Sequence, residues 1–381
     1  MGERVEARAA AFDELAIRIH ERPELAFEER FASSALADHL AREGATVTRG
    51  AGGLETAFAA EIGKGTPVVA ILGEYDALPG VGHACGHNLM GTAAGLAFLA
   101  LRDVAPELPG RVRVVGCPAE ERGNGKVKLI RAGLFADVDV ALMYHPGDRD
   151  EIDPLMLAMV TLDIEFIGKA AHAAAEPHEG RNALDAVLLG WTALSALRLT
   201  VRSDSRFHGI ITDGGKAANV IPDRAAARFM VRSPDNAYLG DLRRRVLACF
   251  EGAAAATGCE LRATWSDVCE LVSTNRPLAD AFAANARTLG REMKPRRAGD
   301  THGSTDMGNV TSIVPGIHPF LSITDGPVAG HSIEFAAAAR TPQALETMHV
   351  AAKALAMTAI DVIRDEKLRA RAKEAQGGQR R

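Results

Sequence analysis

The sequence predicts an α/β fold with a mostly parallel sheet between helices, interrupted by a smaller α+β unit. Short apolar runs typical of strands buried on both faces alternate with helical patterns over residues 1–150. The order of the predicted elements changes after residue 156, and the alternation returns after residue 270. We therefore expect a main domain made of residues 1–156 and 271–381, with a second domain inserted at 157–270.

The first part of the chain supplies the alternating elements. Amphipathic patterns predict helices over 3–22 and 28–43. Further along, apolar runs predict strands, and helical spacing predicts two more helices: strands 68–72, 112–117 and 138–144, helices 88–103 and 125–133. Ligands of such sheets bind beyond the carboxyl ends of the strands, so the residues that follow each strand are candidates for a site.

The middle of the chain has the β-α-β-β-α-β order of the ferredoxin-like split unit. The elements that we expect there are a strand at 160–168, a helix at 181–199, strands at 206–213 and 225–232, a helix at 237–257 and a strand at 259–267. After residue 270 the chain returns to helices and strands and closes with a long helix near 342–372. The tail over 374–381 is predicted to fray.

Composition and charge exclude several classes of protein. The formal net charge of −5, with 5% aromatic residues and no basic cluster, argues against nucleic-acid binding. Apolar runs stop short of the roughly 20 residues that span a bilayer, and the charged first residues lack the apolar core of a signal peptide. The five cysteines are scattered, unlike a disulfide framework. We expect a cytoplasmic protein that does not bind membranes.

The loop after the first apolar strand reads Gly-His-Ala-Cys-Gly-His-Asn over residues 82–88. A thiol at Cys85 and an imidazole at His87, on a glycine-flexed loop, make half of a transition-metal site. Taken alone, the pair is more often a small buried thiol beside a loop histidine. Ligands from elsewhere in the chain are needed to favour metal.

Other strand ends supply residues of the same kind. The second strand leads to Glu120 and Glu121, the third leads to His145, and His331 lies far downstream. A glutamate pair in a loop is usually solvated, and a lone histidine is usually a hydrogen-bonding residue. Clusters that meet at one sheet edge by chance are much less common, so together they predict a metal site.

Five segments, taken in chain order, resemble one known family. They are 74–88 (Glu-Tyr-Asp-Ala-Leu-Pro-Gly-Val-Gly-His-Ala-Cys-Gly-His-Asn), 118–121 (Pro-Ala-Glu-Glu), 168–172 (Gly-Lys-Ala-Ala-His), 219–222 (Asn-Val-Ile-Pro) and 303–310 (Gly-Ser-Thr-Asp-Met-Gly-Asn-Val). The chain resembles the co-catalytic metallopeptidases related to aminoacylase and glutamate carboxypeptidase. It is most similar to the amidohydrolase branch, which includes aminobenzoyl-glutamate hydrolases, auxin-conjugate hydrolases and dipeptidases. The resemblance implies a catalytic domain and a lid through which two copies dimerise.

The resemblance also implies a set of metal ligands. They are Cys85, His87, Glu121, His145 and His331. Cys85 stands where other branches use a bridging aspartate, and a thiolate favours softer cations. We expect two divalent ions per subunit, Zn²⁺ or Mn²⁺ first and Co²⁺ or Ni²⁺ as alternatives. Asp76 matches a carboxylate that orients a ligand imidazole, and His83 is expected to support the loop.

Further roles follow from the same resemblance. Glu120 becomes the general base, which takes a proton from water and passes it to the leaving amine. His172 matches a histidine that reaches the neighbouring subunit's site and donates to the carbonyl oxygen; without the family it reads as a surface histidine. The positions that match substrate contacts are Asn219 and Arg232 for a terminal carboxylate, and Ser304, Thr305 and Asp306 for the pocket.

The expected activity is hydrolysis of the amide bond in an N-acyl amino acid or small dipeptide-like substrate. The main alternative is deamination of an aromatic amine on the same scaffold. A cysteine hydrolase is disfavoured because the sequence indicates no base that could activate Cys85. A structural zinc site is disfavoured because such sites are rich in cysteine. A binding protein that has lost activity is disfavoured because the glutamates and the ligands are retained. Arg122 and Asn124 stand where the branch usually has glycines, so Arg122 either meets an acidic group or turns to solvent.

Overall fold

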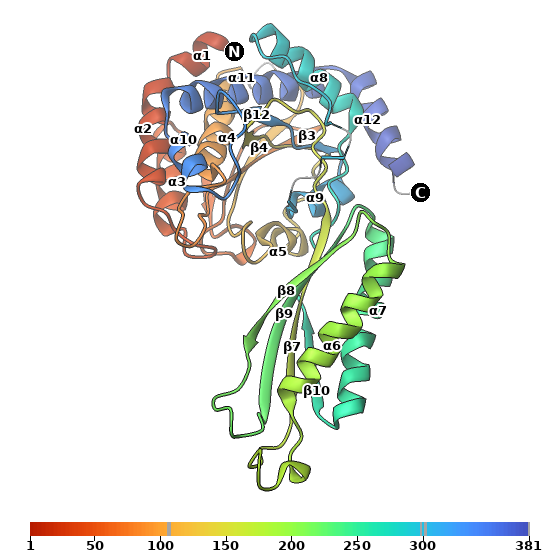
Figure 1. Ribbon diagram of the computed structural model, residues 1–381. Helices are drawn as coiled ribbons and strands as arrows, with labels where there is room; N and C mark the ends of the chain where they lie inside the picture. The colour runs from red at the N-terminus through yellow and green to blue at the C-terminus, as the bar shows by residue number, and fades with distance from the viewer. Residues whose placement is uncertain (105–107, 298, 301–302, 380–381) are drawn as a thin grey trace. The chain divides into compact units, whose positions relative to one another are not determined.

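The computed structural model describes residues 1–104, 108–297, 299–300 and 303–379 (Figure 1). Its contacts divide the chain into two compact units. The α/β unit contains Met1–Leu155 and Val272–Arg381, and the inserted unit contains Met156–Leu271.

A six-stranded sheet forms the centre of the α/β unit. Its strands, in spatial order, are β1 (Val47–Arg49), β2 (Phe58–Gly63), β4 (Arg111–Cys117), β3 (Val68–Glu74), β5 (Val140–Leu142) and β11 (Gly316–Ile317). The last four run parallel, while β1 and β2 add an antiparallel edge. All residues of β3 are buried, as its unbroken apolar run predicts. The mostly parallel sheet is confirmed.

Helix α4 (His87–Arg102) begins in the Cys/His loop and crosses the sheet behind β3 and β4. Every one of its residues except Arg102 is buried, because α2 (Ala9–His20) and α11 (Pro342–Arg364) pack against the sides that the sheet leaves free. The remaining helices of this unit are α1 (Gly2–Glu6), α3 (Arg30–Arg42), α5 (Gly125–Arg131), α8 (Arg276–Thr288), α9 (Met307–Ile313), α10 (Ile333–Ala338) and α12 (Glu366–Gln379).

Three expected elements are divided in the structure. The helix expected over 3–22 breaks at Ala7 and Arg8, where the Arg8 guanidinium turns to the Asp103 carboxylate. The helix expected over 342–372 ends at Arg364, because extended Asp365 accepts the N–H groups of residues 367 and 368 and so caps α12. Helix α12 continues to Gln379, so the expected fraying of the tail is not seen over 374–379. Residues 380–381 lie outside the described residues.

The strand expected over 138–144 is also shorter, since only Val140–Leu142 joins the main sheet. The chain then enters β6 (His145–Gly147), which pairs with β12 (Phe320–Ser322) in a separate two-stranded sheet. This change of sheet sets the direction of the His145 side chain.

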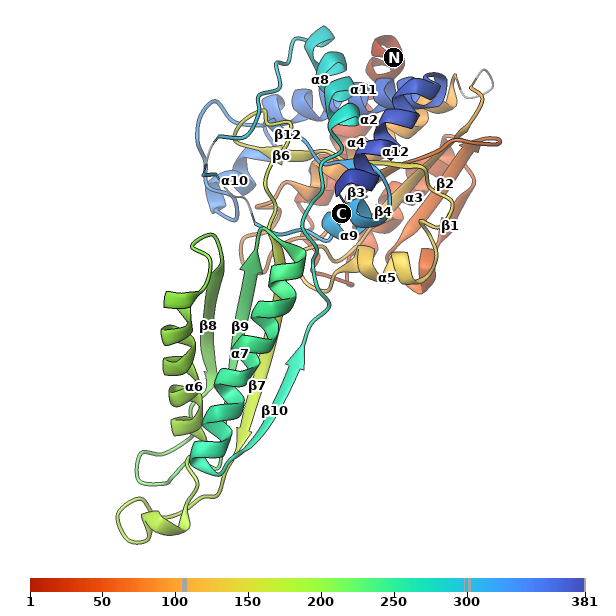
Figure 2. The same ribbon diagram turned by 90° about the vertical axis from the view of Figure 1, so that its right-hand side faces the viewer.

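The inserted unit has the expected β-α-β-β-α-β order. Its elements are β7 (Ala158–Ile167), α6 (Ala183–Leu197), β8 (Arg206–Asp213), β9 (Arg224–Ser233), α7 (Asn236–Thr257) and β10 (Glu260–Trp265). The strands pair antiparallel in the order β10-β7-β9-β8. Along β7, buried residues alternate with half-buried ones, and both helices lie on one face of the sheet (Figure 2). The ferredoxin-like prediction is confirmed.

Segment Ala183–Thr200, which contains α6, is long and apolar enough to meet a test of length and composition for a membrane span. A single helix of this kind is weak evidence for a membrane. Within the inserted unit its Ala186, Val187 and Leu194 are buried in the core, while Leu188 and Leu189 are exposed. All five cysteines are free, as their scattered positions predict.

Candidate metal centre

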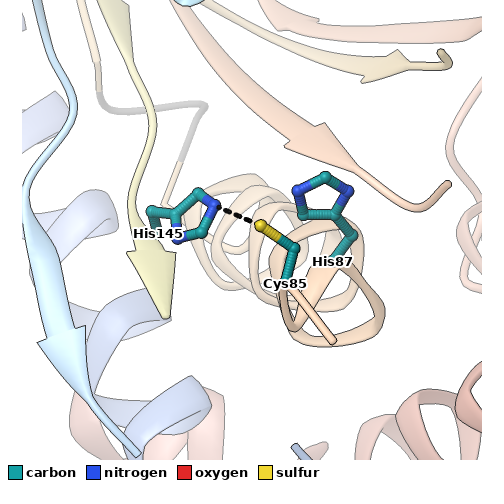
Figure 3. A group of neighbouring side chains, drawn as sticks. All are labelled: Cys85, His87 and His145. Carbon is teal, nitrogen blue, oxygen red and sulfur yellow. Dashed lines mark hydrogen bonds between the residues drawn. The ribbon is translucent and has the colours of Figure 1, made fainter. Parts of the chain in front are cut away.

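Cys85 and His87 lie at the start of α4, with Gly86 between them as the helix cap. Gly86 has a φ of +75°, and a Cβ at this position would lie 2.9 Å from the Pro146 side chain. Glycine is therefore required both by the left-handed backbone and by the close approach. This turn places the Cys85 and His87 side chains beside His145 (Figure 3).

The five predicted metal ligands come together from separate segments of the chain. The Cys85 Sγ lies 3.5 Å from the His145 Nε2 (Figure 3). It lies 3.7 Å from the His331 Nε2. In two groups, the potential ligand atoms all lie within 4.8 Å of one another: Cys85, His87 and His145 in the first, Cys85, Glu121 and His331 in the second. Since Cys85 belongs to both groups, its sulfur is placed to serve two cations.

The donor atoms of this cluster fit a metal. The His87 Nε2 and the Glu121 Oε1 are buried without a hydrogen-bond partner among the described residues. Burial raises the pKa of the Cys85 thiol and of the Glu121 carboxyl, in each case because the charged form is desolvated. A bound cation would reverse both effects, and thiolate, imidazole and carboxylate together suit Zn²⁺ or a similar ion.

Neighbouring carbonyl and carboxylate oxygens orient the imidazoles. The His87 Nδ1 lies 3.0 Å from the Asp76 main-chain oxygen and 3.2 Å from its Oδ1. The His145 Nδ1 lies 2.6 Å from the Pro146 oxygen. With Nδ1–H donating to these oxygens, each ring presents the Nε2 lone pair to the cluster. Asp76 thus lies where the predicted orienting carboxylate belongs.

The loop after β4 directs its two glutamates to different partners. Ala119 has a φ of +60°, and its N–H donates to the buried Glu29 carboxylate at 2.8 Å. The N–H of Glu121 donates to Asp76 at 2.9 Å. Glu121 then lies with Cys85 and His331, while Glu120 lies with His87 and a further carboxylate, Glu74. The strained turn therefore directs the two adjacent glutamates into different groups of potential ligand atoms.

Replacing Glu29 with leucine is expected to lower the free energy of unfolding by about 1–3 kcal/mol, because the Ala119 N–H loses its buried acceptor. Denaturant unfolding measures this loss. Glu29→Gln keeps an acceptor oxygen of the same reach and should lose clearly less. Equal stability of Glu29→Leu and the wild type would contradict the role of Glu29 in holding this turn.

Three buried residues near the ligands had no role assigned from the sequence. Glu74 ends β3, Lys126 lies in the first turn of α5, and His318 follows β11; all three are fully buried. The His318 ring meets the His145 ring edge-on, with 5.4 Å between centroids. Lysine near a helix start and a lone histidine usually face solvent, so nothing in the sequence was a reason to place Lys126 and His318 at the site. Glu74 could have been noticed, because it lies at the end of a strand.

Other predicted residues of the α/β unit differ in how deeply they are buried. His83 is buried with its Nε2 3.1 Å from the Ile19 oxygen, and burial lowers its pKa to about 3, so it is a neutral support of the loop. Thr305 is buried and its hydroxyl accepts the Met307 N–H at 3.2 Å, which suits support of the turn better than contact with substrate. Ser304 is half-buried, and Arg122 is exposed.

In the inserted unit, His172 and Asn219 lie together. A β-bridge joins His172 to Val220, and the Ala173 N–H donates to the Asn219 main-chain oxygen at 3.0 Å. The His172 Nδ1 accepts N–H groups from Ala174 and Ala175 at 3.2 and 3.1 Å, which leaves Nε2–H as a donor.

Arg232 lies at the other end of the same sheet. It pairs with Met159 near the start of β7, whereas His172 follows the end of β7 at Ile167, which pairs with Arg224. Arg232 lies eight residue steps along the strand from Arg224, a distance of about 26 Å at 3.3 Å per residue. Asn219 and Arg232 of one chain therefore do not meet, although the resemblance assigns them one substrate group.

Cysteine, histidine and glutamate side chains that could bind metal, gathered at the carboxyl edge of a parallel sheet beside the half-buried Glu120, are typical of a metal-dependent hydrolase. Residues 70–359 match the model of peptidase family M20/M25/M40, and the chain belongs to this family. It is a hydrolase of carbon–nitrogen bonds, which confirms the family and the class of activity predicted from the sequence.

Two relatives show the range of the family. The chain is 40% identical over 381 residues to the Xaa-Arg dipeptidase of Mus musculus, covering 95% of this chain and 88% of that protein. It is 38% identical over 299 residues to one of the subunits of the p-aminobenzoyl-glutamate hydrolase of Escherichia coli, covering 73% of this chain and 62% of that protein.

Solved structures share the fold. A putative aminohydrolase from methicillin-resistant Staphylococcus aureus has a TM-score of 0.79 at 18% identity, covering 96% of this chain and all (100%) of that one. A dinuclear metal-binding peptidase of the M20 family from Bacillus subtilis has a TM-score of 0.72 at 22% identity, covering 94% and 99%.

Proposed function

We propose that the protein hydrolyses the amide bond of a small dipeptide or N-acyl amino acid, using two divalent transition-metal ions, Zn²⁺ or Mn²⁺. The observation that carries the proposal is the pair of ligand groups that share Cys85. The metal-binding peptidase of similar fold and the dipeptidase and aminobenzoyl-glutamate hydrolase relatives support it. Of these relatives, the Xaa-Arg dipeptidase makes dipeptides with a basic second residue the first substrates to try.

When bound, the ions would lower the pKa of water and polarise the scissile carbonyl. Cys85, His87 and His145 would hold one ion, and Cys85, Glu121 and His331 the other. Glu120 takes the proton of the attacking water and delivers it to the leaving amine. Burial, with the Glu74 and Glu121 carboxylates, raises the pKa of Glu120, which favours a base that can also return its proton.

We further propose that the active enzyme is a dimer through the inserted unit. Because Arg232 and Asn219 lie at opposite ends of one sheet, both can grip one substrate only if they come from different subunits. His172 would then enter the partner's site with Asn219 and donate Nε2–H to the substrate carbonyl. The edge strand β8 carries exposed Ile210 and Ile211, an apolar edge that a second copy would cover.

Replacing Arg232 with alanine is expected to raise KM for substrates with a free terminal carboxylate by roughly 10–100-fold, the usual worth of a charge-assisted hydrogen bond. Steady-state kinetics on a dipeptide and on its C-terminal amide measure the effect. The amide should be a poor substrate of the wild type and should change little in Arg232→Ala. An equal rise for both substrates would contradict a contact with the carboxylate.

The function itself is tested by incubating the protein, loaded with Mn²⁺ or Zn²⁺, with a panel of candidate substrates. The panel contains Xaa-Arg and Xaa-Lys dipeptides, β-alanyl dipeptides, N-acetyl amino acids, aminobenzoyl-glutamate and aromatic amines. Release of a free amino acid, followed by mass spectrometry, supports amide hydrolysis. Ammonia released from an aromatic amine, without amide cleavage, would replace the proposal with deamination.

A further inference from the structure

Behind the metal ligands, a buried lysine joins three segments of the α/β unit. Lys126 is the one lysine or arginine in the buried class among the residues that the structure describes. Its Nζ contacts the Glu74 Oε1 and lies 2.5 Å from the Asp306 Oδ1, and both carboxylates are fully buried. Its main-chain N–H also donates to the Asp306 Oδ2 at 2.8 Å. The end of β3, the start of α5 and the cap of α9 thus meet at one ammonium group.

Stability alone is a weak reason for such a cluster. The desolvation of buried ions offsets much of their attraction, and apolar replacements of similar volume are often as stable. The position of the cluster is more informative than its energy. One oxygen of Glu74 contacts the Lys126 Nζ, and Glu74 also groups with His87 and Glu120. The carboxyl group that the lysine contacts therefore lies directly beside a predicted metal ligand.

The second oxygen of Glu74 faces a metal ligand. Its Oε2 lies 3.3 Å from the His87 Nε2, yet neither atom has a hydrogen-bond partner among the described residues, so the two are close without being aligned. The Nδ1 of His87 is already directed to Asp76. A second hydrogen bond, from Nε2–H to Glu74, would occupy the nitrogen that has to face the cation.

We propose that Lys126 is a positioning residue that restrains Glu74 from forming a hydrogen bond with the His87 Nε2, and so keeps that nitrogen available as a metal ligand. The contact with Lys126 holds the Glu74 Oε1, while Asp306 fixes the lysine from the other side. Without Lys126, Glu74 turns toward His87 and competes with the metal. This inference rests on the proposed metal-dependent function.

The test measures Co²⁺ binding by visible absorption, with circular dichroism to verify folding. Lys126→Met is expected to weaken Co²⁺ binding by about 10–100-fold, the usual effect of losing a group that orients a ligand. The double variant Lys126→Met with Glu74→Leu removes the competitor and should restore binding to within about threefold of the wild type. Lys128→Met is the matched control on the same helix: it changes a half-buried lysine that lies over the Phe27 ring and should bind Co²⁺ as the wild type does.

Each outcome separates the hypotheses. Wild-type protein that does not bind Co²⁺ overturns the proposed function and the inference with it. Wild-type binding that is unchanged in Lys126→Met overturns the inference alone. Weak binding that Glu74→Leu does not rescue shows a general structural role for Lys126 and also overturns it. If Lys126→Met does not fold, Lys126→Gln, which keeps one donor group, is measured with the same rescue and the same expected direction.

Discussion

Replacing Glu120 with glutamine is expected to lower kcat by about 10²–10⁴-fold while both metal ions stay bound. Glutamine has the same shape but cannot accept a proton from water. Glu120 groups with Glu74 and His87, whereas Glu121 belongs to the group of Cys85 and His331, so the substitution leaves the five ligands in place. The measurement is turnover of the best substrate, with metal content by elemental analysis of the same sample.

A matched surface change controls for the chemistry of the substitution. Glu55 is exposed and pairs only loosely with Arg30, at 3.3 Å, so Glu55→Gln should leave both turnover and metal content unchanged. Near-normal turnover of Glu120→Gln would exclude Glu120 as the base. Loss of metal together with turnover would instead make Glu120 a ligand, in the third group of potential ligand atoms that it forms with Glu74 and His87.

The parts of the site that lie close to strand ends could be predicted from the sequence. In a parallel sheet the carboxyl ends meet at one edge, so the loops after β3, β4 and β5 bring Cys85, Glu121 and His145 together by topology alone. Glycine at position 86 makes the local turn, and a glycine beside two metal-type residues is visible in the sequence. The residues that needed only local structure and sheet order could therefore be predicted.

The buried support of the site could not be predicted in the same way. Lys126 lies in a short helix, where a lysine usually faces water, and its burial depends on Glu74, 52 residues before it, and Asp306, 180 residues after it. No local pattern reports such separations. The helix break at Asp365 was missed for a local reason. A single side-chain cap there overrides a continuous helical pattern.

The length of β9 limits which residue roles can be assigned from the family resemblance within a single chain. The motifs around Asn219 and Arg232 match positions that act on one substrate group, yet β9 keeps Arg224, at the end of the sheet where Asn219 lies, about 26 Å from Arg232 in one chain. A strand over 225–232, as predicted from the sequence, already places its two ends about 23 Å apart. Two residues assigned to one ligand but set at the two ends of one strand are thus an argument for a second subunit.

Replacing Cys85 with alanine is expected to remove both metal ions, because its sulfur is the one atom common to the two ligand groups. His331→Ala should release one ion, since His331 belongs to a single group. Cys249→Ala changes a half-buried thiol of the inserted unit and should retain both ions. Thermal unfolding gives a second readout: free metal at 100 times the Kd of each site should stabilise the wild type by about 2.7 kcal/mol for each bound ion and Cys85→Ala hardly at all. Cys85→Ala protein that still holds two ions would show that other atoms bridge them, and the thiol would then be only a neighbour of the site.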